Sequence, residues 1–160
     1  MRIVLLSLLL VGCGMDSPEW DDNHGYGWTF DVQCESGIKL RYTPTLYPGG
    51  FAYEQLSNCH FYDTTLQRMS DCTGIPLPQR RPFIVVLRRD QMPLDQVSGE
   101  TRGGYHYYSP SLILVDETAT HLRHEYLHFL KFQATGNGDP DHLDPQFAYP
   151  SGCVWTVPWI

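Results

Sequence analysis

The sequence His124-Glu125-Tyr126-Leu127-His128 lies within Ala119–Gln133, a stretch that has the apolar spacing of a helix. Two histidines four positions apart lie on one face of a helix, so both imidazoles can bind the same metal ion. The glutamate after the first histidine flanks the pair and can take a proton from water that the metal activates. We therefore predict a helix that carries His124 and His128 as metal ligands and Glu125 as a general base.

The residues around the motif predict the limits of this helix. Thr118 or Thr120 can cap its N-terminus, and Gly136 is of the type that commonly ends a helix. The apolar run Ser111–Val115 comes just before and predicts an interior strand. Much of the remaining helix surface is apolar, which indicates burial, and buried histidines need polar or metal partners. The alternative is an ordinary core helix whose polar residues bind no metal.

A catalytic zinc ion has three protein ligands and one position open for water. Turn-forming residues follow Gly136 and allow the chain to fold back towards the helix. His142 is the only histidine after the motif, and we predict that it is the third ligand of a single Zn²⁺ ion. The alternative ligands are the nearby aspartates Asp139, Asp141 and Asp144. His121 lies one turn before the motif, and we interpret it as structural.

The segments before the motif predict a small sheet and one more helix. Gly37–Thr43 alternates apolar and charged residues, as a strand with one buried face does. Pro82–Arg89 contains a continuous apolar run, which is typical of a central strand covered on both faces. Apolar residues at helical spacing between these strands predict a helix that ends near Gly74. These residues are Cys59, Tyr62, Leu66 and Met69.

The glycines at 103 and 104 mark the start of a segment that differs from the predicted interior strands. Gly104–Tyr108 has strand composition and is stopped by Ser109-Pro110, so we interpret it as a short, exposed edge strand. Together, these segments predict the α+β class. The expected architecture is a small mixed or antiparallel sheet with an exposed edge strand, packed on two helices, one of which carries the motif.

The N-terminus has the features of an export signal. Arg2 precedes the apolar run Ile3–Val11, which is too short to span a bilayer as a helix. Leu10-Val11-Gly12-Cys13 resembles the bacterial lipobox, whose cysteine is lipidated; the alternative is a plain secretory signal. We predict a signal peptide at 1–12, a lipid-anchored tether at 13–33 and one domain at 34–160. The resemblance implies export and anchoring to the cell envelope, at the outer membrane if the cell has two membranes.

Four cysteines remain besides Cys13, and in an exported protein they predict two disulfides. They are Cys34, Cys59, Cys72 and Cys153. If the segment between Cys59 and Cys72 is helical, these two residues lie roughly 20 Å apart along its axis, beyond disulfide reach. Each should therefore pair with Cys34 or Cys153. The formal net charge of −7 argues against a nucleic-acid partner, and we expect a monomer.

The order strand, helix, strand, edge strand, strand and then an H-E-x-x-H helix resembles the zincin metallopeptidases. In that family the motif histidines bind zinc and the glutamate is the general base, which implies these roles for His124, His128 and Glu125. The family's edge strand pairs with an extended peptide substrate. The resemblance therefore implies substrate contacts in the segment Gly104, Tyr105 and His106.

The chain departs from the individual zincin clans. Lys131 and Ala134 stand where the metzincin extension has a glycine and a third histidine. No glutamate follows Glu125, although the gluzincin scheme needs one, and Thr135-Gly136 reverses the aspzincin pair. The resemblance thus leaves open the third ligand and the group that stabilises the oxyanion. Candidates for the latter are Tyr105, His106 and Tyr149.

These observations predict a lipid-anchored, zinc-dependent metallopeptidase that acts on peptides or proteins. Glu125 would be its general base, and its contact with the membrane would be the N-terminal lipid at Cys13. The alternative is a non-catalytic zinc-binding lipoprotein that uses a zincin-like scaffold as a binding module. Retention of zinc without peptide hydrolysis would distinguish the second function from the first.

Overall fold

The computed structural model describes residues 32–42, 59–94, 103–107, 111–139 and 141–158. The predicted signal peptide, Cys13 and nearly all of the predicted tether lie outside these residues, as does Tyr108 of the predicted edge strand. Within the described ranges, no helix combines the length and the apolar character needed to cross a bilayer.

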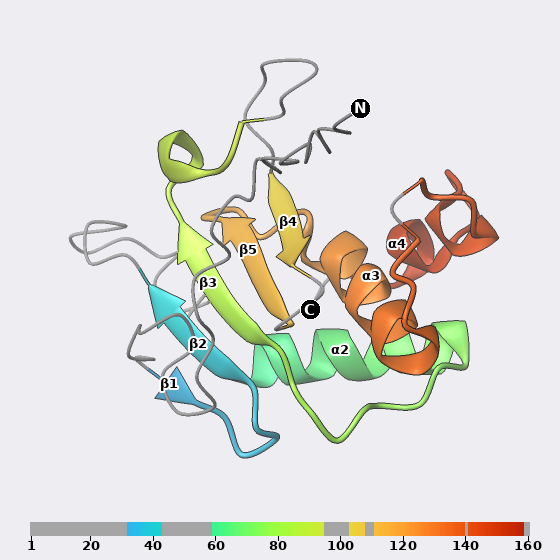
Figure 1. Cartoon of the computed structure of the whole chain (residues 1–160), viewed down its shortest axis with the longest axis horizontal. Helices are drawn as coiled ribbons and strands as arrows, with labels where there is room; N and C mark the ends of the chain where they lie inside the picture. The colour runs from blue at the N-terminus through green and yellow to red at the C-terminus, as the bar shows by residue number, and fades with distance from the viewer. Residues whose placement is uncertain (1–31, 43–58, 95–102, 108–110, 140, 159–160) are drawn as a thin grey trace, which may run out of the picture.

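A five-stranded mixed sheet has the strand order β1-β2-β3-β5-β4 (Figure 1). The strands are β1 (Val32–Gln33), β2 (Lys39–Tyr42), β3 (Phe83–Leu87), β4 (Gly104–Tyr107) and β5 (Leu112–Asp116). β2, β3 and β5 are parallel, whereas β1 and β4 run antiparallel to their neighbours at the two edges. The α+β class, the interior strands and the edge position of the 104–107 segment are therefore confirmed.

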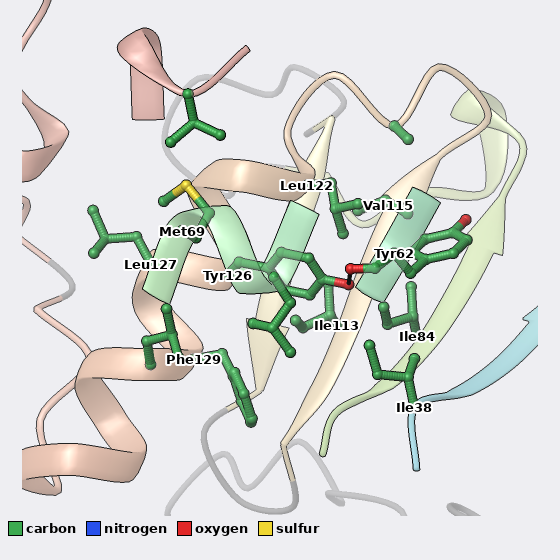
Figure 2. Close-up of a cluster of buried hydrophobic side chains, with 14 of the residues drawn as sticks. Ile38, Tyr62, Met69, Ile84, Ile113, Val115, Leu122, Tyr126, Leu127 and Phe129 are labelled. Atoms are coloured by element: carbon green, nitrogen blue, oxygen red, sulfur yellow. Dashed lines mark hydrogen bonds between the residues drawn. The ribbon is translucent and has the colours of Figure 1, made fainter. Parts of the chain in front are cut away.

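Two helices cover one face of this sheet (Figure 1). They are α2 (Cys59–Thr73) and α3 (Leu122–Thr135). The predicted first helix is confirmed, and Gly74, with a φ of 70°, follows its last residue. In the core shown in Figure 2, Tyr126 donates a hydrogen bond of 3.2 Å to the carbonyl of Tyr62, which joins the two helices where both are fully buried.

Alternate residues of β3 and β5 face opposite sides of the sheet, and both sides are buried. Ile84 and Ile113 contact the helices, whereas Val85 and Leu114 belong to a second apolar cluster with Met92. This burial on both faces accounts for the continuous apolar runs in the sequence.

The start of α3 differs from the prediction. The helix begins at Leu122, not Ala119, because the carboxylate of Asp116 accepts a hydrogen bond of 3.1 Å from the backbone N–H of Thr118. This local turn competes with helix formation, and Ala119 adopts a left-handed φ of 52°. His121 occupies the N-cap position, where no side chain caps the helix, so the expected caps at positions 118 and 120 were wrong.

The C-terminal segment contains two short elements that the sequence did not predict. They are the 3-10 helix η2 (Pro145–Phe147) and α4 (Cys153–Thr156). The disulfides are Cys34–Cys59 and Cys72–Cys153, so the exclusion of a Cys59–Cys72 pair is confirmed. The second disulfide connects α4 to the C-terminal end of α2.

Candidate metal centre

Three histidine side chains converge beside α3. His124 and His128 lie one turn apart on the helix, and His142 comes from the loop that follows it. Nε2 of His128 is 3.1 Å from Nε2 of His124 and 3.0 Å from Nε2 of His142. Two nitrogens bound to one tetrahedral zinc ion are roughly 3.3 Å apart. The three predicted ligands therefore lie close enough together to hold one ion, and all three possible ligand atoms are within 4.8 Å of one another.

A backbone carbonyl sets the tautomer of His128. Its Nδ1 lies 2.6 Å from the carbonyl oxygen of Gly138, which can only accept a hydrogen bond. Nδ1 therefore carries the proton, and the lone pair of Nε2 points towards the other two histidines. This is the arrangement that orients and strengthens a histidine ligand in metal sites.

The loop that carries His142 is held in an uncommon conformation. Gly136 ends α3 with a φ of 75°, and both Asp139 and His142 have left-handed backbones, with φ of 57° and 54°. Such conformations cost on the order of 1 kcal/mol each for residues other than glycine. The Asp139 carboxylate stabilises them by accepting hydrogen bonds from the backbone N–H groups of Leu143, at 3.1 Å, and Asp144, at 2.7 Å.

Lys131 holds this loop against the helix. Its ammonium group forms an ion pair with Asp144 and lies 3.8 Å from the carboxylate of Asp139. The hydrogen bond from Lys131 lowers the pKa of Asp144. Desolvation raises the pKa of Asp139, but backbone hydrogen bonds and the lysine charge outweigh it, so the net pKa is lowered. These two aspartates, considered as alternative ligands, instead position the loop, and the exposed Asp141 is not part of the cluster.

Phe147 closes one side of the histidine cluster. Its ring centroid lies 5.1 Å from that of His124 and 4.6 Å from those of His128 and His142. Burial, followed by the charges of neighbouring histidines, lowers the pKa of His124 to about 3, and burial also lowers the pKa of His128. Both imidazoles are therefore neutral near pH 7, which is the form that binds metal.

The Glu125 side chain lies between the helix and the edge strand. It is 4% exposed, and a Cβ on Gly104 would be only 2.6 Å from its Oε1 atom. The exposed His121 has its ring against Gly103, and its Nδ1 lies 3.1 Å from the Thr120 hydroxyl. The two glycines thus allow β4 to approach α3 closely where the motif begins.

The predicted substrate-contact and oxyanion residues are more widely separated. Tyr105 packs against the apolar cluster on the sheet face away from α3. His106 is buried on the α3 side, with edge-on ring contacts to Phe129 at 6.0 Å and Phe132 at 6.4 Å. Tyr149 is 78% exposed and contacts Trp155, with centroids 5.1 Å apart. Their side chains do not join the histidine cluster.

Sequence reasoning missed three contributors to the site. Lys131 was noted only as a departure from the metzincin pattern, although the acidic loop that follows it was a signal for an ion pair. Gly138 acts through its backbone carbonyl and Phe147 through its shape, so neither has a recognisable motif.

Comparison of the chain with protein-family models, with characterised proteins and with solved structures gives no match.

Proposed function

We propose that the chain is a zinc-dependent peptidase in which His124, His128 and His142 hold the metal. The observation that carries the proposal is the convergence of three imidazoles, with Nε2 separations of 3.0 and 3.1 Å around His128. Neutral imidazoles suit several transition metals, and three histidine ligands with one open position suit catalytic Zn²⁺ best. Bound there, Zn²⁺ would polarise a water molecule and the scissile carbonyl.

Glu125 is the proposed general base. It directly follows a ligand histidine, and its burial keeps bulk water away from its carboxylate. In this role it takes the proton of the attacking water and passes it to the leaving amine. Glu125 lies on the same helix as His124 and His128, so the helix fixes its backbone relative to two of the proposed ligands, and this supports the role.

β4, the edge strand of the sheet among the described residues, is the proposed contact for an extended peptide. The backbone N–H of Asp116 donates to the carbonyl of Gly103 at 3.1 Å, and in the antiparallel register Gly104 faces Val115. Because hydrogen-bonded and non-hydrogen-bonded pairs alternate, the backbone groups of Gly104 and His106 point away from β5. The proposed place of contact for a substrate strand is Gly104, beside Glu125. This backbone role does not need the side chains of Tyr105 and His106.

The proposed setting is the cell envelope, reached through the predicted signal peptide and the lipid on Cys13. Two disulfides support an oxidising compartment, because such bonds are rare in reducing ones. The protein would act there as a monomer on peptide or protein substrates.

The test is metal content and hydrolysis measured on the same preparations. Wild-type protein purified without an affinity tag should contain one Zn²⁺ per chain, and His142→Ala should lose most of it. Glu125→Gln should keep zinc but lose hydrolysis of a diverse peptide library. His60→Gln, on α2, is the matched control and should change neither. Zinc in wild type without any hydrolysis would refute the peptidase and leave the zinc-binding module.

A further inference from the structure

The two disulfides differ in their access to solvent. Cys34 is buried and Cys59 is partly buried, and both pack against the main core. Cys153 is buried as well, but its partner Cys72 is exposed at the end of α2. Cys72 lies in an open cleft of about 380 Å³, which is lined by Arg68, Asp71, Cys72, Thr156, Val157 and Pro158. A thiol reagent can therefore reach one sulfur of the second disulfide.

The buried half of this disulfide belongs to the segment that supports the metal site. The backbone N–H of Cys153 donates to Oε1 of Gln146 at 3.4 Å, and Trp155 Nε1 donates to the carbonyl of Phe147 at 3.0 Å. A Cβ on Gly152 would lie 2.2 Å from the carbonyl oxygen of Gln146, so α4 and η2 are in close contact. The two short helices thus form one unit.

Phe147 is the residue of this unit that contacts the histidines. Its ring contacts all three imidazoles, and it is the only aromatic residue of η2. The buried side chains of this segment are Phe147, Cys153, Val154 and Val157, and they pack against the main core. Polar contacts also attach it to the helices: Arg68 donates to the Pro158 carbonyl at 3.3 Å, Arg123 donates to the Val157 carbonyl, and Lys131 of α3 pairs with Asp144, the N-cap of η2. The disulfide is its one covalent link to α2.

We propose that the Cys72–Cys153 disulfide is a redox site that sets the metal affinity of the three-histidine cluster. Its reduction frees α4 and η2 from α2, so that Phe147 no longer restricts the imidazoles to their converging arrangement. This inference rests on the metal centre of the proposed function, but it does not require peptide hydrolysis.

The reaction is a two-electron exchange with a dithiol. One thiolate of the dithiol attacks Sγ of Cys72, the S–S bond breaks, and Cys153 leaves as a thiolate that takes up a proton. The second thiol of the reagent then attacks the mixed disulfide, which releases the Cys72 thiol and the oxidised, cyclic reagent. The protein gains two electrons and two protons, and the dithiol loses them.

The first measurement is the order of reduction. Full-length protein is treated with increasing dithiothreitol, quenched with an alkylating reagent and mapped by peptide mass spectrometry. Cys72 and Cys153 should be alkylated at a lower dithiothreitol concentration than Cys34 and Cys59. Reduction of the Cys34–Cys59 bond first, or of both bonds together, overturns the proposal.

The second measurement is Zn²⁺ affinity, by competition with a chromophoric chelator. Because dithiols bind zinc themselves, the affinity is measured on serine variants without reductant. Cys72→Ser/Cys153→Ser should bind Zn²⁺ at least about tenfold more weakly than wild type, the size of effect that outer-shell support has on metal sites. The matched control Cys34→Ser/Cys59→Ser should change by less than about threefold, because its bond joins the opposite end of α2 from Cys72.

Three outcomes separate this inference from the proposed function. Equal Zn²⁺ affinities of wild type and Cys72→Ser/Cys153→Ser overturn the inference alone. Absence of Zn²⁺ binding by oxidised wild type overturns the metal centre and the inference together. If the serine variant does not fold, wild-type protein that has been selectively reduced, alkylated and desalted is titrated with Zn²⁺ instead. Global unfolding of that protein would show that the bond is purely structural and would overturn the inference.

Discussion

Replacement of Gly104 by alanine should displace Glu125 without touching a metal ligand. The new Cβ would lie 2.6 Å from Oε1 of Glu125 and 2.8 Å from Cβ of His121. An ordinary carbon–oxygen contact is about 3.3 Å, so the carboxylate must retreat by roughly 0.7 Å. The φ of Gly104 is not left-handed, so the backbone accepts alanine and the effect is steric.

Gly104→Ala should impair turnover strongly while the domain stays folded. A displacement approaching 1 Å costs about 10- to 100-fold in turnover when it moves a reacting group. Overpacking at a buried site costs about 1–3 kcal/mol of folding free energy, which leaves the domain folded. Zn²⁺ content should stay at the wild-type level, because none of the three atoms nearest the new Cβ belongs to His124, His128 or His142.

The assay compares kcat/KM on a peptide cleaved by wild type with zinc content and thermal unfolding. Gly103→Ala is the matched control, since the three atoms nearest its Cβ all belong to the ring of His121, with Nδ1 at 2.1 Å. That ring is exposed and can turn into solvent, so the control should keep near wild-type turnover. Wild-type turnover in Gly104→Ala, or zinc loss as large as that of His142→Ala, would refute the assignment of Glu125 to this contact.

Three further variants test other parts of the site. Phe147→Ala removes a ring that is 9% exposed and should lower the free energy of unfolding by about 3–5 kcal/mol and weaken Zn²⁺ binding; unchanged zinc affinity by chelator competition would contradict its supporting role. Lys131→Met should keep the fold but weaken Zn²⁺ binding several-fold, because Asp144 loses its ion-pair partner. Calorimetric titration with Zn²⁺ measures this affinity, and a wild-type value would contradict the expected role of Lys131. Burial, then the charge of His128, lowers the pKa of His106 to about 3, so the unfolded chain binds a proton below about pH 6.5 that the folded protein does not. Stability should therefore fall as the pH drops from 6.5 to 3, by up to about 1.4 kcal/mol per pH unit from this group, and His106→Phe should reduce that slope in urea unfolding; an unchanged slope would argue against the burial effect.

The sequence predicts the parts of this protein that depend on periodicity and spacing. The apolar runs at 83–87 and 112–115 are interior strands because burial on both faces selects apolar residues at every position. His124 and His128 share a helix face because helical geometry requires it, and the same geometry excludes a Cys59–Cys72 bond. His142 was found by elimination, as the only histidine after the motif.

Features that depend on local competition or shape were not predictable. The three-residue delay in the start of α3 comes from one hydrogen bond to the Asp116 carboxylate, which competes with a helix cap of similar strength. β1 is two residues long, too short for a periodic signal. Phe147 belongs to a segment that a disulfide across 81 positions of sequence joins to α2, and contacts over such a separation leave no local signal in the sequence.

The division of the three histidines between a helix and a strained loop has a consequence for how the ion enters and leaves. His124 and His128 both lie on α3, so the helix holds them as a preorganised pair of possible ligands. His142 lies in a left-handed turn held by Asp139, so in the proposed metal centre it would be the last ligand to bind the ion and the first to leave it. Exchange of the ion would then need only the His142 loop to move away, while the core of the domain stays intact.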